Sequence, residues 1–171
     1  MKFKFTKSEK IALFLALLIM VMLFISSSMT YKQQKFSPDS IRQKFGWIEA
    51  IIKNWNICYG GVWHNRISDN GLANFTQFFV RKLAHFGSYF LLGLFLFYGL
   101  RRIFVLKWTA PIFVWTTTIT YAVSDEFHQF LTGDRTPSVH DVVLDGSGSL
   151  LAIILLVIYF MIRKYLRKNK G

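Results

Sequence analysis

The hydrophobic residues of this chain concentrate in four long runs, and most of the charged residues lie between or beyond them. A helix needs about 20 apolar residues to cross the hydrocarbon core of a bilayer. The runs therefore predict an all-α polytopic membrane protein, a single domain over residues 1–171 with four transmembrane helices at about 11–31, 83–100, 108–125 and 141–162. The basic start, the apolar core and the small residues Ser26 and Ser28 also fit a cleaved signal peptide, which would leave three helices.

The polar segment from 32 to 82 carries a second pattern, with hydrophobic residues at helical spacing. Ser37 is a suitable N-cap, and Pro38 fits the first helical position. The apolar residues that follow lie three or four apart and share one helix face: Ile41, Phe45, Ile48, Ile52 and Trp55. This pattern fits an amphipathic helix lying in the headgroup plane. It fits equally well a cap packed on the protein's own outer end.

Composition supports the membrane class and limits the partners. Hydrophobic residues make up 53% of the chain, too many for an ordinary soluble domain of this size. The net charge of +12 would suit nucleic acid, but the basic residues lie at the ends of apolar runs, which indicates anchoring to the lipid bilayer instead. Cys58 is the only cysteine, so an intramolecular disulfide and a paired-cysteine zinc site are both excluded.

The basic residues also predict an orientation in the cell membrane. Most of the 21 lysines and arginines fall in three short segments, at the N-terminus, around residues 101–107 and in the C-terminal tail. With four spans these segments share one side, and the positive-inside rule makes that side cytoplasmic. The main loop, 32–82, is then extracytoplasmic, and His85 reaches the same membrane face as the acidic stretch from Asp125 to Asp145.

That acidic stretch is the most unusual part of the sequence, because carboxylates flanked by hydrocarbon-length runs are energetically costly. Helical spacing places polar residues on one stripe of each of the last three predicted helices. Four of them are candidate catalytic residues: His85, Asp125, Glu126 and Asp141. Seven others are candidate ligand-binding residues: Arg81, Lys82, Tyr89, Gln129, Arg135, Ser138 and Asp145. The stripe of the last helix continues into Gly148 and Ala152, which favours close approach by another helix.

With these motifs the sequence resembles the VanZ-like membrane proteins. The resemblance lies in RKLAHFGSYFLLG, in DEFHQF, and in the spacing of Arg135, Ser138, Asp141, Asp145 and Gly148. It implies a role at the cell envelope in tolerance to glycopeptide antibiotics of the teicoplanin type, but it implies no particular reaction. The chain departs from the family pattern at Ala152, where a second glycine is expected, and at Asp145, where asparagine is frequent. A charge at Asp145 is therefore not essential to a shared mechanism.

Three functions are compatible with these polar residues. In the preferred one, cations and carboxylates at headgroup depth bind an anionic ligand such as a lipid-linked cell-wall precursor, with Arg135 as the strongest anion-binding candidate. In the second, the protein is an intramembrane hydrolase or transferase using His85 with Glu126 or Asp141 as acid and base. The donor types would also suit zinc or manganese, although no metal-ligand spacing supports such a site. In the third, these groups join helices through hydrogen bonds, in a structural partner of another membrane protein.

Overall fold

The structure is a computed structural model that describes residues 4–132 and 136–169, with the backbone alone described for residues 31 and 32. It is an all-α protein with one small β-hairpin. The helices are α1 (Lys7–Ser27), α2 (Tyr31–Gln34), α3 (Pro38–Ile52), α4 (Leu72–Leu100), α5 (Thr109–Leu131) and α6 (Val139–Lys168). The hairpin pairs β1 (Ile57–Tyr59) with β2 (Val62–His64) in antiparallel register.

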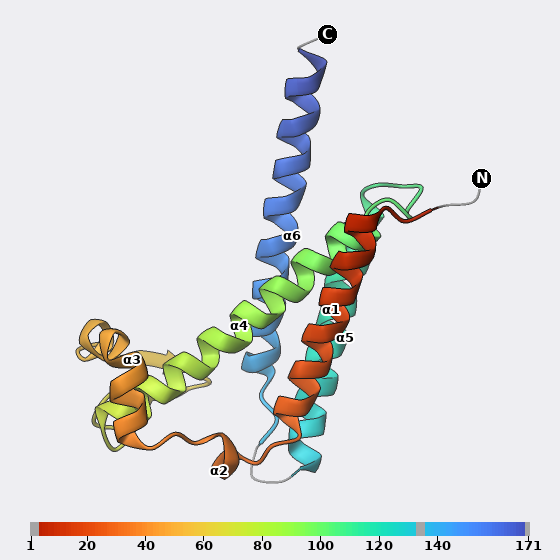
Figure 1. Cartoon of the computed structure of the whole chain (residues 1–171). Helices are drawn as coiled ribbons and strands as arrows, with labels where there is room; N and C mark the ends of the chain where they lie inside the picture. The colour runs from red at the N-terminus through yellow and green to blue at the C-terminus, as the bar shows by residue number, and fades with distance from the viewer. Residues whose placement is uncertain (1–3, 133–135, 170–171) are drawn as a thin grey trace.

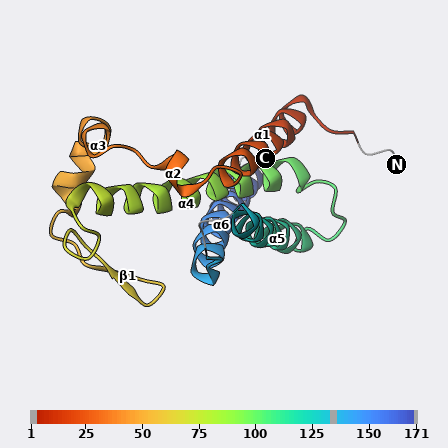
Figure 2. The same cartoon turned by 90° about the horizontal axis from the view of Figure 1, so that it is seen from below.

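The long, tilted helix α4 is the centre of the fold (Figure 1). It packs against α6 most extensively and also against α1, α5 and α3. Helices α1 and α5 lie side by side, and α6 crosses α4 and extends beyond it at the C-terminal end (Figure 1). Seen from below, α3 lies at the N-terminal end of α4, away from α1, α5 and α6, whereas the hairpin extends from there toward the start of α6 (Figure 2). The bundle thus has a terminal end, near both chain termini, and a loop end, where α1 stops and α6 starts.

Helices α4 and α6 approach closely because glycines occupy their contact. A Cβ atom at Gly93 would lie 2.8 Å from the Cα of Ser149, and one at Gly148 would collide with the carbonyl oxygen of Phe86. Ala152, one turn further along α6, is fully buried. The prediction that small residues on this stripe admit another helix is therefore confirmed. The contact fixes the position of the first turns of α6 against α4.

The amphipathic segment forms α3, beginning at Pro38 as predicted, and the Ser37 side chain accepts a hydrogen bond from the Ser40 backbone N–H. Ile48 and Ile52 pack against Phe75 near the start of α4. Helix α3 therefore packs on the protein's own end where α4 begins, as the second of the two interpretations predicted. This contact also explains why α4 begins at Leu72 rather than at about residue 83: its first turns are amphipathic and pack on α3, so they lie outside the apolar run.

The other ends differ from the predicted spans by smaller amounts. Helix α1 begins at Lys7, because Thr6 and Glu9 form a capping box there, and it ends at Ser27 instead of Tyr31. Helix α5 continues past Asp125 to Leu131, and α6 continues past Ile162 to Lys168. Polar ends of helices were omitted from the predicted spans because these were bounded by hydrophobicity alone.

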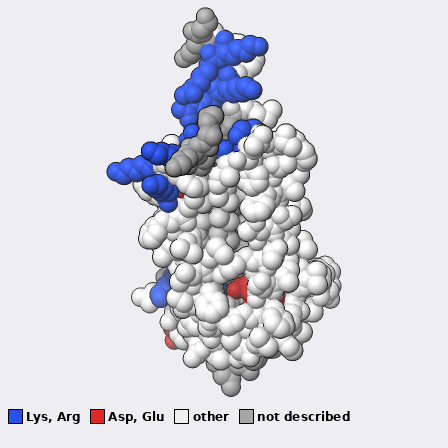
Figure 3. Space-filling view, turned by 90° about the vertical axis from the view of Figure 1, so that its right-hand side faces the viewer, with Lys and Arg blue, Asp and Glu red and all other residues white. Residues whose placement is uncertain are grey.

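Three helices of the described chain, α1, α4 and α6, are long and apolar enough to cross a membrane. Large hydrophobic side chains are exposed along them, including Phe14 and Met22 on α1 and Leu155 on α6. Lysines and arginines gather at the terminal end, and below them the surface is almost free of charge (Figure 3). Such a surface is stable in lipid and unstable in water, so the chain is a multi-pass membrane protein. Helix α5 falls outside these three, so the structure does not establish the predicted number of four spans.

Candidate functional site

Near the loop end, α4, α5, α6 and the hairpin bring a group of polar side chains together inside the apolar bundle. We call this group the polar centre. It consists of Tyr59, Lys82, His85, Tyr89, Asp125, Glu126, Gln129, Asp141 and Asp145. Most of the candidates from the sequence are therefore close in space, although they come from three separate helices.

The innermost part of the polar centre is a histidine–carboxylate pair. His85 Nδ1 lies 3.6 Å from Asp145 Oδ2, an ion-pair distance that is longer than a hydrogen bond. Asp145 is 1% exposed, and neither of its oxygens has a hydrogen-bond partner among the described residues. The hydroxyl of Tyr89, fully buried on the same helix as His85, is also without one. His85 interacts electrostatically with Asp125 and Asp141 as well. Buried polar groups normally have partners, so this region has unused hydrogen-bonding capacity.

Asp141, one turn before Asp145 on α6, has by contrast two hydrogen-bond partners on one of its oxygens. Lys82 Nζ of α4 lies 2.5 Å from Asp141 Oδ1, and the Tyr59 hydroxyl donates a hydrogen bond to the same oxygen. The Lys82 ammonium group also lies 4.5 Å from the centre of the Tyr59 ring, a cation–π contact. Burial, and then the hydrogen bond to Asp141, raises the pKa of Tyr59 well above its ordinary value. Tyr59 therefore remains a hydrogen-bond donor at neutral pH.

Tyr59 was not among the residues singled out from the sequence. It reaches the polar centre because Gly60 and Gly61 have φ angles of 61° and 79°, which a tight two-residue hairpin turn requires. The signal in the sequence was this glycine pair between two short alternating segments, ICY and VWH. This pair forms the turn of a hairpin, and the hairpin places Tyr59 against the first turn of α6.

The two acids of α5 are held by neighbours on the same side of the bundle. Gln129 Nε2 donates a 2.9 Å hydrogen bond to Asp125 Oδ2, in agreement with the four-residue spacing. Glu126 Oε2 accepts a 2.8 Å hydrogen bond from the backbone N–H of Ser138, just before α6. Ser138 occupies the N-cap position of α6, but its side chain makes no capping hydrogen bond. Glu126 thus fixes the start of α6 through the Ser138 backbone.

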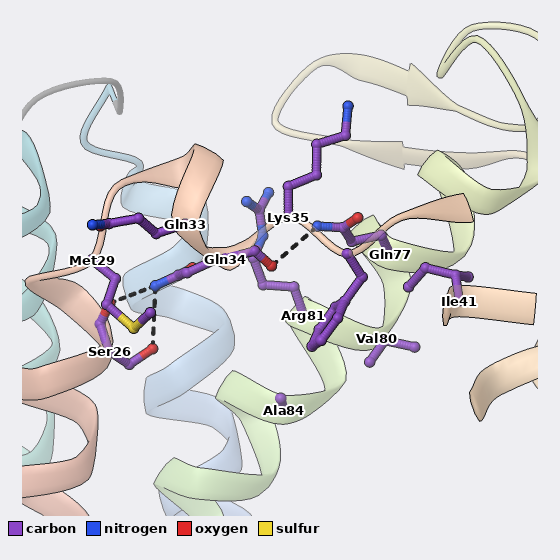
Figure 4. A pocket seen from close by; sticks show the side chains of 11 residues that line it. Ser26, Met29, Gln33, Gln34, Lys35, Ile41, Gln77, Val80, Arg81 and Ala84 are labelled. Atoms are coloured by element: carbon purple, nitrogen blue, oxygen red, sulfur yellow. Dashed lines mark hydrogen bonds between the residues drawn. The ribbon is translucent and has the colours of Figure 1, made fainter. Parts of the chain in front are cut away.

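The remaining candidates lie at the edge of the polar centre or beyond it. Arg81 extends from α4 into a neighbouring cavity (Figure 4). Arg135 lies outside the described residues. His128 and His140 contact Ser28 and the Tyr59 ring respectively.

The polar centre contains more negative than positive side chains. Four carboxylates face two basic side chains, Lys82 and His85, within the described part of the site. Across those parts of the chain that the structure describes, no group of three or more His, Cys, Asp or Glu residues is placed to hold a metal ion. The arrangement favours proton transfer and hydrogen bonding over binding of an anion directly among the acids.

A second buried ion cluster, which the sequence did not reveal, lies at the terminal end. Glu9 of α1 is 1% exposed, and its carboxylate lies 3.2 Å from Arg102 Nη1 and 3.8 Å from Arg101 Nη2. It also accepts a 2.9 Å hydrogen bond from the Thr6 backbone N–H. The S/T-x-x-E capping box was the available signal, but it predicts only the start of a helix, without indicating a tertiary partner.

Charged and hydroxyl side chains buried between apolar helices define a multi-pass membrane protein with a polar centre inside its helix bundle. A family model described as VanZ/LLP1 matches residues 12–162, and the chain therefore belongs to this family. The match confirms the resemblance inferred from the motifs of α4, α5 and α6. Comparison with curated proteins and with solved structures found no match.

Proposed function

We propose that this protein resides in the cell membrane and lowers susceptibility to glycopeptide antibiotics of the teicoplanin type. In this proposal the loop end of the bundle binds an anionic lipid or a lipid-linked cell-wall precursor. Membership of the VanZ/LLP1 family supports the envelope role. The observation that carries the proposal is the convergence of the buried Asp125 and Asp145 with the partly exposed His85 and Asp141 inside the bundle, which a bundle needing only stability would not require.

The proposal includes α5 as a fourth membrane span. Its threonines and a serine make it less apolar than the other three, but their hydroxyls donate back to carbonyl oxygens of the preceding turn. Thr117, for example, donates to the Phe113 carbonyl oxygen at 2.8 Å. A hydroxyl satisfied within its own helix can face lipid at little cost. The position of α5 beside α1, α4 and α6 also supports this count (Figure 1).

The proposed orientation places both termini in the cytoplasm and the loop end outside. Its support is the grouping of basic residues at the terminal end, together with the positive-inside rule (Figure 3). Exposed tryptophans near the loop end, Trp47, Trp55 and Trp63, suit the opposite membrane–water interface. A cysteine-accessibility experiment on Lys170→Cys and Ser68→Cys in a Cys58→Ser background tests this orientation. Labelling of residue 170 by an impermeant reagent in intact cells would contradict it.

The function is tested by measuring teicoplanin susceptibility of cells that express the full chain. We expect His85→Ala and Glu126→Gln to abolish protection while their amounts in the membrane remain near that of the wild type. Asp39→Asn removes an exposed carboxylate of α3, outside the polar centre, and serves as the matched control. If both site variants still protect, the polar centre has no part in the function.

A second candidate function is an intramembrane hydrolase or transferase. It is favoured by the histidine–carboxylate pair, which can hold and move a proton. The contacts favour Asp145 as the partner of His85, because Asp141 is bound by Lys82 and Tyr59 and Glu126 by the Ser138 backbone. Incubation of the reconstituted protein with a polyprenyl diphosphate, followed by assay of released phosphate, tests it. Release that requires His85 would establish the enzyme, and no release would leave the binding function.

A further inference from the structure

A cavity of about 490 Å³ lies beside the polar centre, between the segment that follows α1 and the N-terminal half of α4 (Figure 4). The side chains that line it form an apolar part and a polar part. Val80, Ala84 and Ile41 provide an apolar part, whereas Arg81, Gln34 and Gln77 provide a polar part. This volume and this division are typical of cavities that take an amphiphilic small molecule.

The cavity and the polar centre differ in charge although they share α4. Its eleven lining residues include Arg81 and, at the rim, Lys35, but none of them is acidic. The polar centre, whose Lys82 directly follows Arg81 on α4, contains four carboxylates. An anion approaching the loop end is therefore attracted to the cavity and repelled by the acids. Arg81 has the planar fork that matches two oxygens of a phosphate group.

The polar wall of the cavity is held in place by the protein itself. Gln34 Nε2 donates a 2.5 Å hydrogen bond to the Ser26 carbonyl oxygen, and Gln77 Nε2 donates a 3.5 Å bond to the Gln34 carbonyl oxygen. Figure 4 shows the Arg81 side chain extending from α4 toward the segment that contains Gln34. These bonds tie the segment after α1 to α4, so the cavity exists before a ligand arrives and a ligand loses little to reorganisation.

The position of the cavity indicates a lipid. It begins where α1 ends, at Ser26 and Met29, and it includes Ile41 of α3, the helix that also carries the exposed Trp47. We infer that this cavity binds an anionic phospholipid, with the phosphate at Arg81 and the start of an acyl chain against Val80 and Ala84. The inference rests on the proposed function, because it assigns a ligand class to the same end of the protein. It places the anion next to the acidic residues rather than among them.

Native mass spectrometry of the full chain in detergent, titrated with phosphatidylglycerol, tests this site. We expect phosphatidylglycerol to bind at least tenfold more tightly than phosphatidylcholine, and we expect Arg81→Gln to reduce its affinity roughly tenfold, because a charge-assisted hydrogen bond is lost. Arg42→Gln makes the same substitution at an exposed position of α3 outside the cavity and should leave the affinity unchanged. Inorganic phosphate should not displace the lipid, because it lacks an acyl chain.

The outcomes separate this inference from the proposed function. Equal binding of the two lipids, displacement by inorganic phosphate, or normal affinity in a folded Arg81→Gln variant would each overturn it, whatever the effect on teicoplanin susceptibility. If Arg81→Gln does not fold, the Ala84→Phe variant tests the inference instead, because it fills the apolar part of the cavity without removing a charge. A folded Ala84→Phe variant that binds phosphatidylglycerol as tightly as the wild type would also refute the inference.

Discussion

The two ends of the bundle each bury charged groups, but they treat them in different ways. At the terminal end, Glu9 has two arginines and a backbone N–H for a single carboxylate. At the loop end, four carboxylates share two basic side chains, and Asp145 and Tyr89 have buried polar atoms without hydrogen bonds among the described residues. A satisfied cluster joins helices, whereas a cluster with unused capacity is available for a ligand, a water molecule or a proton. We therefore propose a structural role for the first cluster and a functional role for the second.

The largest expected effect comes from separating the two helices that carry the polar centre. Gly148→Leu would place a side chain against the Phe86 carbonyl oxygen, so we expect a loss of about 3 kcal/mol or more in the free energy of unfolding. Gly87 lies on α4 with open space around its missing Cβ, so Gly87→Leu should melt like the wild type. Thermal unfolding of detergent-purified protein, followed by size-exclusion chromatography, measures both. Equal stability of the two variants would show that the close approach does not hold the polar centre.

The terminal-end cluster should be the more sensitive of the two to loss of a carboxylate. Glu9→Ala removes a capping box and two ion pairs, one of which is screened because Arg102 is half exposed, so we expect a loss of about 1–2 kcal/mol. Teicoplanin protection, corrected for the amount of protein in the membrane, should not change. A normally expressed Glu9→Ala variant without protection would show that the terminal end also takes part in the function.

Asp145→Asn tests the role of a carboxylate at the loop end of the bundle. Because Asp145 makes no hydrogen bond among the described side chains, the neutral amide should alter stability by less than about 1 kcal/mol. If the polar centre binds a ligand and catalyses no reaction, protection should persist, because the amide keeps a polar side chain at this position. Persistence would support binding and eliminate the His85–Asp145 pair as an acid–base device. Loss of protection in a folded variant would favour the enzymatic candidate.

A pH-dependent effect on stability is expected at Tyr59, which links the hairpin to the polar centre. Tyr59→Phe removes one hydrogen bond to Asp141, and we expect a loss of about 1 kcal/mol near neutral pH. The raised pKa means that this stabilisation is complete below about pH 10, the pKa of an unfolded tyrosine, and declines as the pH rises beyond it. The difference in melting temperature between wild type and Tyr59→Phe should therefore shrink between pH 8 and pH 11. A constant difference would mean that the hydroxyl is not a hydrogen-bond donor.

Much of the architecture could be predicted because the bilayer imposes simple rules on composition. Apolar runs identified α1, α4 and α6, and the Ser37–Pro38 pair located the start of α3. Helical spacing predicted that His85, Asp125 and Asp145 meet at one end of the bundle, because the polar face of each helix must contact the neighbouring helices rather than lipid. Helix starts were less accurate, since the first turns of α4 depend on packing against α3, not on local hydrophobicity.

The sequence alone determined the membrane class, the VanZ-like relationship and most of the polar residues that meet, because these follow from hydrocarbon length, helical period and motif. Only the tertiary structure decided which partner each residue has. It assigned Lys82 and Tyr59 to Asp141, the Ser138 backbone to Glu126, and His85 to Asp145. Those pairings depend on the crossing of α4 over α6 and on a hairpin turn made by two glycines. Distances between segments far apart in the chain are set by packing, which no local pattern encodes.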